Sequence, residues 1–247
     1  MTELLYPGGK VRLYVEAALG AGVHVAPDTQ QTHYLLHVMR AGVGSHVRLF
    51  NGRDGEWLAR IDSVTRRDCS LVCESRTAAQ ERSCDLWLLF APVKKTPADY
   101  LAQKATELGV SALQPVFTRR TIVHRVNSER VRANAIEAAE QSGRLTVPEI
   151  REPVDLEKIV AQWPRDRRLL FCDEGGAPPM LEAIAGKTHG PWAVLTGPEG
   201  GFDPEERAMI RAMAAAVPVS LGKRILRADT AALAALAICQ AAKDAKN

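Results

Sequence analysis

From residue 86 onward, short apolar runs alternate with segments of helical pattern, and this alternation limits the fold more than any other feature. The apolar runs are short and rich in Leu, Val and Phe, as buried parallel strands are. Strands are expected at Leu86–Ala91, Ala112–Phe117, Arg168–Cys172, Trp192–Leu195 and Val217–Leu221. Helices are expected at Pro97–Leu108, Ser128–Gln141, Pro179–Ala185, Pro204–Ala215 and from Asp229 onward. The sequence therefore predicts an α/β domain with a mostly parallel sheet covered on both faces.

The first 74 residues follow a different pattern, in which short alternating runs are separated by turn residues. Asn51-Gly52 is a strong turn signal, and one helical patch is expected near Thr32–Arg40. Strands are expected at Val11–Val15, Val47–Phe50, Glu56–Ile61 and Cys69–Cys73. This spacing predicts a small β-barrel. The polar composition that follows indicates a linker, so we expect a barrel at 1–74, a linker at 75–85 and the α/β domain at 86–247.

Composition constrains the function only loosely. The net charge of +3 is compatible with an anionic partner but does not require one. The five cysteines form an odd set without a C-x-x-C pair, which indicates reduced and mostly buried thiols in a cytoplasmic protein. We expect neither a signal peptide nor a membrane-spanning segment. His33 and His37 have metal-ligand spacing, but a metal needs three or four ligands, so a structural or surface role is favoured and no metal is expected.

The stretch Leu195–Glu206 combines a strand end, three glycines and a well-marked helix start. Asp203 can cap the helix, Pro204 suits its first position, and Glu206 completes a capping box. A strand, a glycine loop and a capped helix commonly present backbone N–H groups to a ligand. An ordinary tight strand-to-helix connection would look the same, and the loop by itself does not decide between the two.

A second unusual loop, Leu221–Ala231, follows the next strand. Ile225 and Leu226 are apolar residues in a basic segment that contains Arg224 and Arg227. They could form a wall for a flat apolar ligand group such as a purine, or they could pack beneath the loop as core. Successive strand ends of a parallel sheet often form one ligand crevice. The last helix is apolar on both faces, which suits either a core or a subunit interface.

The two loops together carry a family resemblance. Gly197-Pro-Glu-Gly-Gly201, followed by Leu221-Gly222 and Arg224 to Thr230, resembles the C-terminal signature of the SPOUT methyltransferases. Within that superfamily, the chain most resembles the bacterial 16S ribosomal RNA uracil-N3 methyltransferases. Upstream matches are Lys104–Gly109, Glu140–Arg144 with Val147-Pro148, His37–Arg40, and Gly44 with Leu49–Gly52. The resemblance covers almost the whole chain.

This resemblance implies an N-terminal PUA-like RNA-binding barrel and a C-terminal domain with a deep trefoil knot, a rare exception to unthreaded chains. It also implies a homodimer and S-adenosylmethionine bound in a bent form within the knot. By position, the cofactor site would be lined by Thr196, Gly197, Pro198, Glu199, Gly200, Leu221, Gly222, Ile225, Leu226 and Thr230. The family often has Glu where this chain has Asp229. If that carboxylate only caps the helix, Asp serves well; if it must reach the substrate, its role here is open.

Methylation of uracil N3 requires loss of a proton, so a base or a cation that stabilises the uracil anion is needed. Arg227 is the first catalytic candidate, because arginine stays protonated and suits the anion-stabilising role. Glu199 is the second; positioning of the cofactor ranks above proton abstraction for it. Candidates for contact with the phosphates of 16S ribosomal RNA are Arg12, Arg40, Lys94, Lys95, Arg119, Arg120 and Arg144.

Two other functions are alternatives to methylation of uracil N3. A SPOUT enzyme could instead methylate a ribose 2′-oxygen or a transfer RNA base, although the PUA-like domain and the upstream motifs argue against this. An RNA-binding assembly factor without catalysis is a further alternative, which the intact loop glycines oppose. A dinucleotide-binding dehydrogenase fits worse, because the loop lacks the G-x-G-x-x-G spacing.

Overall fold

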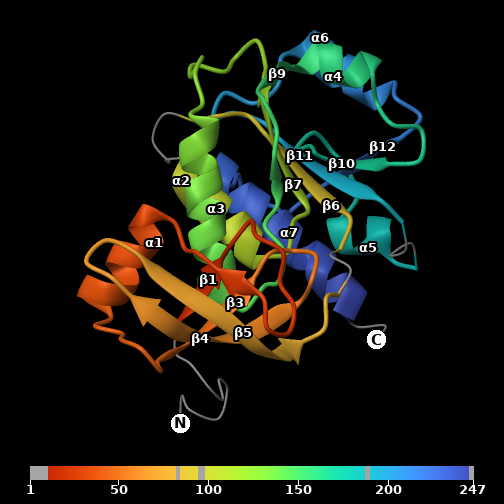
Figure 1. The fold of residues 1–247 in the computed structure, drawn as a ribbon. Coiled ribbons are helices and arrows are strands. Elements are labelled where there is room, and N and C mark those ends of the chain that lie inside the picture. Colours follow the sequence, from red (N-terminus) through yellow and green to blue (C-terminus); the bar gives the residue numbers. More distant parts are fainter. Residues whose placement is uncertain (1–10, 82–83, 94–97, 187–189, 245–247) are drawn as a thin grey trace. The chain divides into compact units, whose positions relative to one another are not determined.

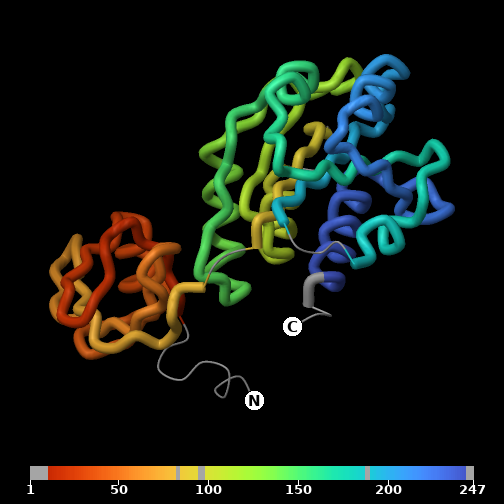
Figure 2. Tube along the Cα trace, turned by 90° about the vertical axis from the view of Figure 1, so that its right-hand side faces the viewer, coloured from red at the N-terminus to blue at the C-terminus, as the bar shows by residue number. Residues whose placement is uncertain are grey.

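The computed structural model describes residues 11–81, 84–93, 98–186 and 190–244, and the chain divides into two compact units (Figures 1 and 2). The first unit contains Met1–Arg82 and Ala139–Val147; the second contains Ser83–Ala138 and Pro148–Asn247. The chain thus changes unit within the segment expected to be a linker. Residues 75–78 of that segment continue a strand, and 139–147, expected in the second domain, belongs to the first unit.

The first unit is a five-stranded curled sheet of order β1-β3-β4-β5-β2. β1 pairs with β3 in parallel, and the other pairs are antiparallel. Its elements are β1 (Arg12–Tyr14), β2 (His24–Val25), α1 (Thr29–His33), η1 (Tyr34–Val38), β3 (His46–Phe50), β4 (Glu56–Val64) and β5 (Cys69–Ala78). Alternate strand residues such as Leu49, Ile61 and Leu71 are fully buried and form its core. The expected helix is present, but its second half is a π-helical turn.

The predicted turn after β3 is held by its own side chains. Asn51 Oδ1 accepts N–H groups from Arg53 and Asp54 at 3.0 and 2.9 Å, which is how asparagine stabilises turns. Gly55 has φ +84°, and a Cβ atom there would lie 2.3 Å from the Ala78 carbonyl oxygen. Only glycine fits this position.

A buried charged group ties segment 139–147 to the curled sheet. Arg12 on β1 is 7% exposed and forms an ion pair with Glu56 at 2.6 Å. The same guanidinium donates to the carbonyl oxygens of Ala139, Glu140 and Arg144 at 2.8–2.9 Å. These carbonyls lie at and beyond the end of helix α3 (Ser128–Ser142), where helix C=O groups lack partners within the helix. Arg12 therefore explains why this segment belongs to the first unit.

The second unit contains a seven-stranded parallel sheet in the order β12-β10-β11-β6-β7-β8, with β9 paired to β7 (Figure 1). Its strands are β6 (Leu86–Phe90), β7 (Ala112–Phe117), β8 (Glu149–Ile150), β9 (Val154–Asp155), β10 (Arg168–Cys172), β11 (Trp192–Thr196) and β12 (Ala216–Val219). Its helices, besides α3, are α2 (Ala98–Glu107), α4 (Leu156–Ala161), α5 (Met180–Ile184), α6 (Pro204–Arg211) and α7 (Ala228–Asp244). The predicted parallel α/β architecture is confirmed.

Helices cover both faces of this sheet. Leu88 and Phe90 of β6 belong to a core that also contains residues of α2, α5 and α7. Leu89, between them in sequence, belongs to a second core with residues of α4 and α6. The alternation follows from the strand period of two. Strands buried on both faces explain the continuous apolar runs in the sequence.

Among the described residues, no helix has the length and apolar character needed to cross a bilayer. All five cysteines are free thiols. The His33 and His37 rings lie with centroids 4.9 Å apart and their planes tilted by 43°, and the described part of the chain contains no group of three or more potential metal ligands.

Candidate functional site

The carboxyl ends of three neighbouring strands, β12, β10 and β11, surround a cavity of about 280 Å³. This volume is close to that of sites for small ligands. The cavity is lined by the glycine loop after β11, by the loop after β12 and by the end of β10. The crevice expected from two strand ends is therefore present, and a third strand contributes to it.

The glycine loop leads into α6 through the predicted capping box. Asp203 accepts an N–H from Glu205 at 3.0 Å, and Glu206 Oε2 accepts the N–H of Asp203 at 3.0 Å. Glu206 is 3% exposed, and its other oxygen accepts the N–H of Arg119 at 2.8 Å. One buried carboxylate thus joins α6 to the segment after β7, a connection that the sequence did not reveal.

Close packing explains the first glycine of the loop. A Cβ atom at Gly197 would lie 2.8 Å from Cε2 of Phe202. Phe202 is buried and packs edge-on against Phe171, with ring centroids 5.1 Å apart. Gly197 also lines the cavity, between Thr196 and Pro198, and contributes only backbone there. Such a surface allows a ligand to approach backbone polar groups closely.

The second loop also lines the cavity. Leu221, Gly222, Arg224, Ile225, Leu226 and Arg227 line it. Ile225 is 92% exposed, so it is not a core residue, and the alternative of packing beneath the loop is wrong for it. An exposed isoleucine at the edge of a cavity gives apolar area that a planar ligand group can cover.

The end of β10 contributes residues that sequence reasoning missed: Cys172, Asp173 and Glu174. The Asp173 side chain is fully buried and paired with Arg211 at 2.6 Å and with Arg207 at 3.5 Å. It also accepts the N–H of Gly175 at 2.9 Å. Its charge is therefore compensated inside the protein. The position directly after a predicted parallel strand was the available signal, because that is where ligand-contacting residues gather.

The nearby thiol of Cys172 does not act as a nucleophile. Desolvation, followed by the proximity of Cys239, raises the pKa of Cys172 to about 12. The nucleophile and metal ligand is the thiolate, which is absent at neutral pH for such a group. Cys172 therefore contributes apolar wall to the cavity.

Most residues expected to bind the cofactor do line this cavity: Thr196, Gly197, Pro198, Glu199, Leu221, Gly222, Ile225 and Leu226. Gly200 and Thr230 are not among the lining residues. Gly200 points its carbonyl oxygen at Arg120, and the N–H of Thr230 donates to Asp229 Oδ1 at 2.8 Å. This bond holds the Asp229 carboxylate at the first turn of α7. Both catalytic candidates, Arg227 and Glu199, lie on the cavity wall.

Two family models match the chain in these regions. The RNA methyltransferase domain model matches residues 80–240, and the RNA methyltransferase PUA domain model matches residues 27–72. The chain belongs to this RNA methyltransferase family. The match to the first model includes every strand of the parallel sheet, and the match to the second includes β3, β4 and the start of β5.

Named relatives and solved structures resemble the methyltransferase over most of its length. Ribosomal RNA small subunit methyltransferase E of Rickettsia conorii is 30% identical, with 92% of this chain and 93% of that protein aligned. The protein of the same name from Synechocystis is 34% identical over 86% of this chain and 71% of that protein. Ribosomal RNA small subunit methyltransferase E from Neisseria gonorrhoeae, solved bound to S-adenosyl methionine, has a TM-score of 0.84 and 28% identity, covering 94% of this chain and 97% of that one. A Legionella pneumophila protein solved with bound SAM gives a TM-score of 0.83 at the same identity and coverage.

The arginines expected to contact RNA have different environments in the methyltransferase. Arg40 is exposed and adopts φ 53°, the left-handed region that non-glycine residues seldom occupy. Arg120 is exposed and donates to Gly200. The Arg119 side chain is 47% exposed and paired with Asp203, Glu205 and Glu157. Arg144 is half-buried and donates to Thr146 Oγ1 at 3.0 Å. Lys94 and Lys95 lie outside the described residues.

Arg12 requires a correction. Its guanidinium is buried and engaged by Glu56 and three carbonyl oxygens, so it is not available for a phosphate. The sequence showed an arginine on an alternating strand, where an inward or an outward side chain is equally consistent with the pattern. The buried carboxylate of Glu56, 44 residues away, decides the direction.

Proposed function

We propose that this methyltransferase transfers a methyl group from S-adenosylmethionine to N3 of a specific uridine in 16S ribosomal RNA of the small subunit. The observation that carries the proposal is the cavity formed by the glycine loop and the Leu221–Ala231 loop, on the family's signature residues. Relatives named small subunit methyltransferase E align over 92% and 86% of this chain and support the substrate class.

The residues of the cavity fit S-adenosylmethionine. Leu221, Ile225 and Leu226 offer apolar area for a purine ring. Gly197 lines the cavity with backbone alone, which a ligand can approach closely. When bound, the cofactor supplies a methyl group on a sulfonium centre, so the protein mainly has to align donor and acceptor.

Arg227 and Glu199 have distinct roles in this proposal. Arg227 stabilises the negative charge that develops on the uracil as its N3 proton leaves, because an arginine on a cavity wall remains charged. Glu199 positions the cofactor near the sulfonium, and proton abstraction is the second role considered for it. Phosphates of the RNA are contacted by Arg40 and Arg144 of the first unit and by Arg119 and Arg120 of the second unit.

We further propose that the methyltransferase acts in the cytoplasm as a homodimer with a trefoil-knotted second domain. The family resemblance supports these points, and the small residues of α7 would allow close packing between subunits.

Mapping methylated uridines decides the function. Ribosomal RNA from strains with and without this gene should differ by one N3-methyluridine in 16S RNA, detected by mass spectrometry of nuclease fragments. Unchanged 16S RNA together with a lost ribose or transfer RNA methyl group would move the activity to another SPOUT substrate. An unchanged methylation pattern and no calorimetric binding of the cofactor would indicate a non-catalytic assembly factor.

A further inference from the structure

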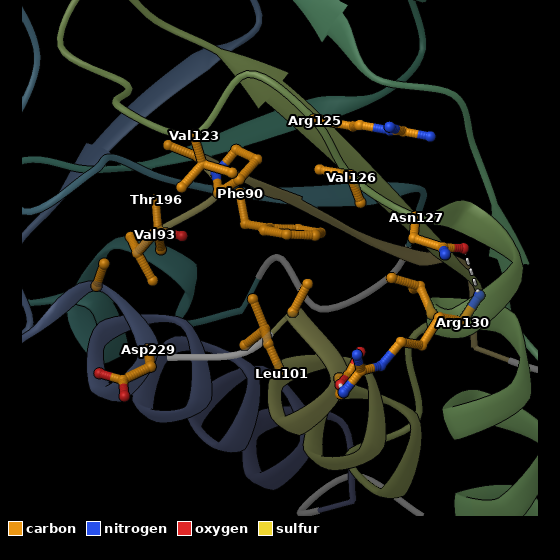
Figure 3. A pocket seen from close by; sticks show the side chains of 16 residues that line it. Phe90, Val93, Leu101, Val123, Arg125, Val126, Asn127, Arg130, Thr196 and Asp229 are labelled. Carbon is orange, nitrogen blue, oxygen red and sulfur yellow. Dashed lines mark hydrogen bonds and ion pairs between the residues drawn. The ribbon is translucent and has the colours of Figure 1, made fainter. Parts of the chain in front are cut away.

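A second cavity of about 350 Å³ adjoins the cofactor cavity (Figure 3). Thr196 and Ala228 line both cavities. The remaining walls come from the end of β6, the first turn of α2, residues 123–127 and the first turn of α3. A compound in this second cavity would therefore lie beside whatever occupies the first.

The interior of this cavity is an apolar slot. Phe90, Leu101 and Val131 are buried and belong to the core, while Val123 and Val126 are half-buried at its wall. In Figure 3, the Phe90 ring lies on one side of the slot and Leu101 on the other. Two apolar faces opposite each other suit a flat ring that is polar only at its edge.

Polar and charged groups lie at the ends and the rim of the slot: Asp229, in the first turn of α7, lies at one end, and Asn127 and Arg130 lie at the other (Figure 3). Arg130 forms an ion pair with Asp99 at 2.5 Å. Asn127 Oδ1 accepts the backbone N–H of Arg130 at 2.9 Å, which fixes the first turn of α3. Arg125 is exposed and extends away from the slot (Figure 3). The rim thus has two arginines for phosphates, one of which is already balanced by Asp99.

We propose that this slot receives the uracil ring of the target nucleotide. A base can be methylated at N3 only when it is unpaired, and enzymes that modify bases take the base out of the stack into a pocket. The slot has the apolar faces for such a base, arginines at its rim for the adjoining phosphates, and a shared wall with the cofactor cavity at Thr196 and Ala228. This inference rests on the proposed function and specifies where its acceptor binds.

Filling the slot without touching the cofactor cavity tests the proposal. Val123→Trp places a large side chain in the slot, because Val123 lines this cavity and not the other. Ile122→Trp is the matched control, since Ile122 is 68% exposed and lines neither cavity. Val126→Phe, a smaller change at a second wall position, repeats the test if Val123→Trp fails to fold.

Two measurements are compared for each variant: the dissociation constant of S-adenosylmethionine by calorimetry, and single-turnover methyl transfer to 16S RNA. For Val123→Trp, transfer should fall about 100-fold or more, because the acceptor loses its position, while cofactor affinity stays within about threefold. Ile122→Trp should leave both within about threefold of wild type. Retained transfer in both slot variants, or a loss of cofactor affinity as large as the loss of transfer, would overturn the assignment. Absence of transfer by the wild-type protein would instead contradict the proposed function.

Discussion

Arg120 donates a hydrogen bond to the carbonyl oxygen of Gly200 at 2.8 Å, so the segment after β7 supports the glycine loop after β11. The Cβ and Cδ atoms of Arg120 also lie 3.6 Å from the position that a Cβ of Gly200 would take. Arg120 thus holds Gly200, whose two neighbours in the loop, Glu199 and Gly201, line the cofactor cavity. An arginine considered only for RNA contact therefore also has a role in positioning the loop.

Replacing Arg120 should weaken cofactor binding. Arg120→Ala removes one exposed charge-assisted hydrogen bond, worth about 1 kcal/mol, so the dissociation constant should rise about fivefold. Arg165→Ala is the control, because Arg165 is exposed, has the same charge and lines neither cavity. Calorimetry with S-adenosylmethionine measures both. An equal effect in the two variants would assign the loss to net charge rather than to the bond with Gly200.

Glu206 should be essential for the stability of the second unit. Its two oxygens accept N–H groups from Arg119 and Asp203, and the carboxylate is almost fully buried. Glu206→Gln keeps one acceptor but turns an NH₂ group toward the other donor, so unfolding should become easier by about 2 kcal/mol. Urea denaturation measures this loss. Glu205→Gln, at an exposed neighbour, should change the free energy of unfolding by less than about 0.5 kcal/mol. A loss as large as that of Glu206→Gln would mean that the negative charge at the start of α6, and not the buried hydrogen bonds, causes the destabilisation.

The sequence was sufficient to predict the parallel sheet, because strands with apolar residues on both faces occur mainly in sheets that helices cover on both sides. Apolar runs such as Leu86–Ala91 and capped helices such as α6 are formed by residues adjacent in the chain, so they can be recognised from the sequence alone. β8 and β9, of two residues each, and the short helix α4 have too little pattern to detect. The assignment of 139–147 to the first unit depends on Arg12, a contact across more than a hundred residues.

The sequence predicted those parts of the site whose lining residues are adjacent in the chain. Both signature loops could be found because glycines and apolar residues interrupt the usual polar pattern of a loop. Asp173 was missed because an isolated Asp after a strand resembles any turn residue; only the fold brings Arg207 and Arg211 to it. The slot beside Phe90 was missed because its residues come from five separate segments.

Arg227→Ala should abolish methyl transfer while cofactor affinity stays within a few fold. The guanidinium is proposed to act on the developing uracil charge, and loss of such a group costs about 100-fold or more in rate. Arg224→Ala, in the same loop and on the same cavity, is the comparison. Single-turnover assays and calorimetry separate the two effects. Loss of cofactor binding in Arg227→Ala would remove this residue from the catalytic candidates.

Acid should destabilise the first unit through Glu56. Burial opposes ionisation of this carboxyl, but hydrogen bonds from Arg12 and Thr77 and the charges of Arg12 and Arg48 outweigh it, so the pKa of Glu56 is lowered from 4.5. A group with a depressed folded-state pKa stabilises the fold fully above its unfolded pKa and loses that contribution as the pH falls through the folded value. Stability should therefore fall with pH below about 4.5.

Glu56→Gln tests this, because glutamine cannot ionise. The variant should be less stable than wild type at pH 7, since Arg12 and Arg48 lose their buried counter-charge, a change that costs about 3 kcal/mol when one partner of a buried pair is removed. Its urea midpoint should vary less than that of the wild type below pH 4.5. Glu74→Gln is a useful comparison: the pKa of Glu74 is also lowered, by hydrogen bonds from Arg60 and His46, but its side chain is 37% exposed. Equal flattening of the acid limb in both variants would show that exposed pairs, and not the buried Arg12–Glu56 pair, determine the acid sensitivity of this unit.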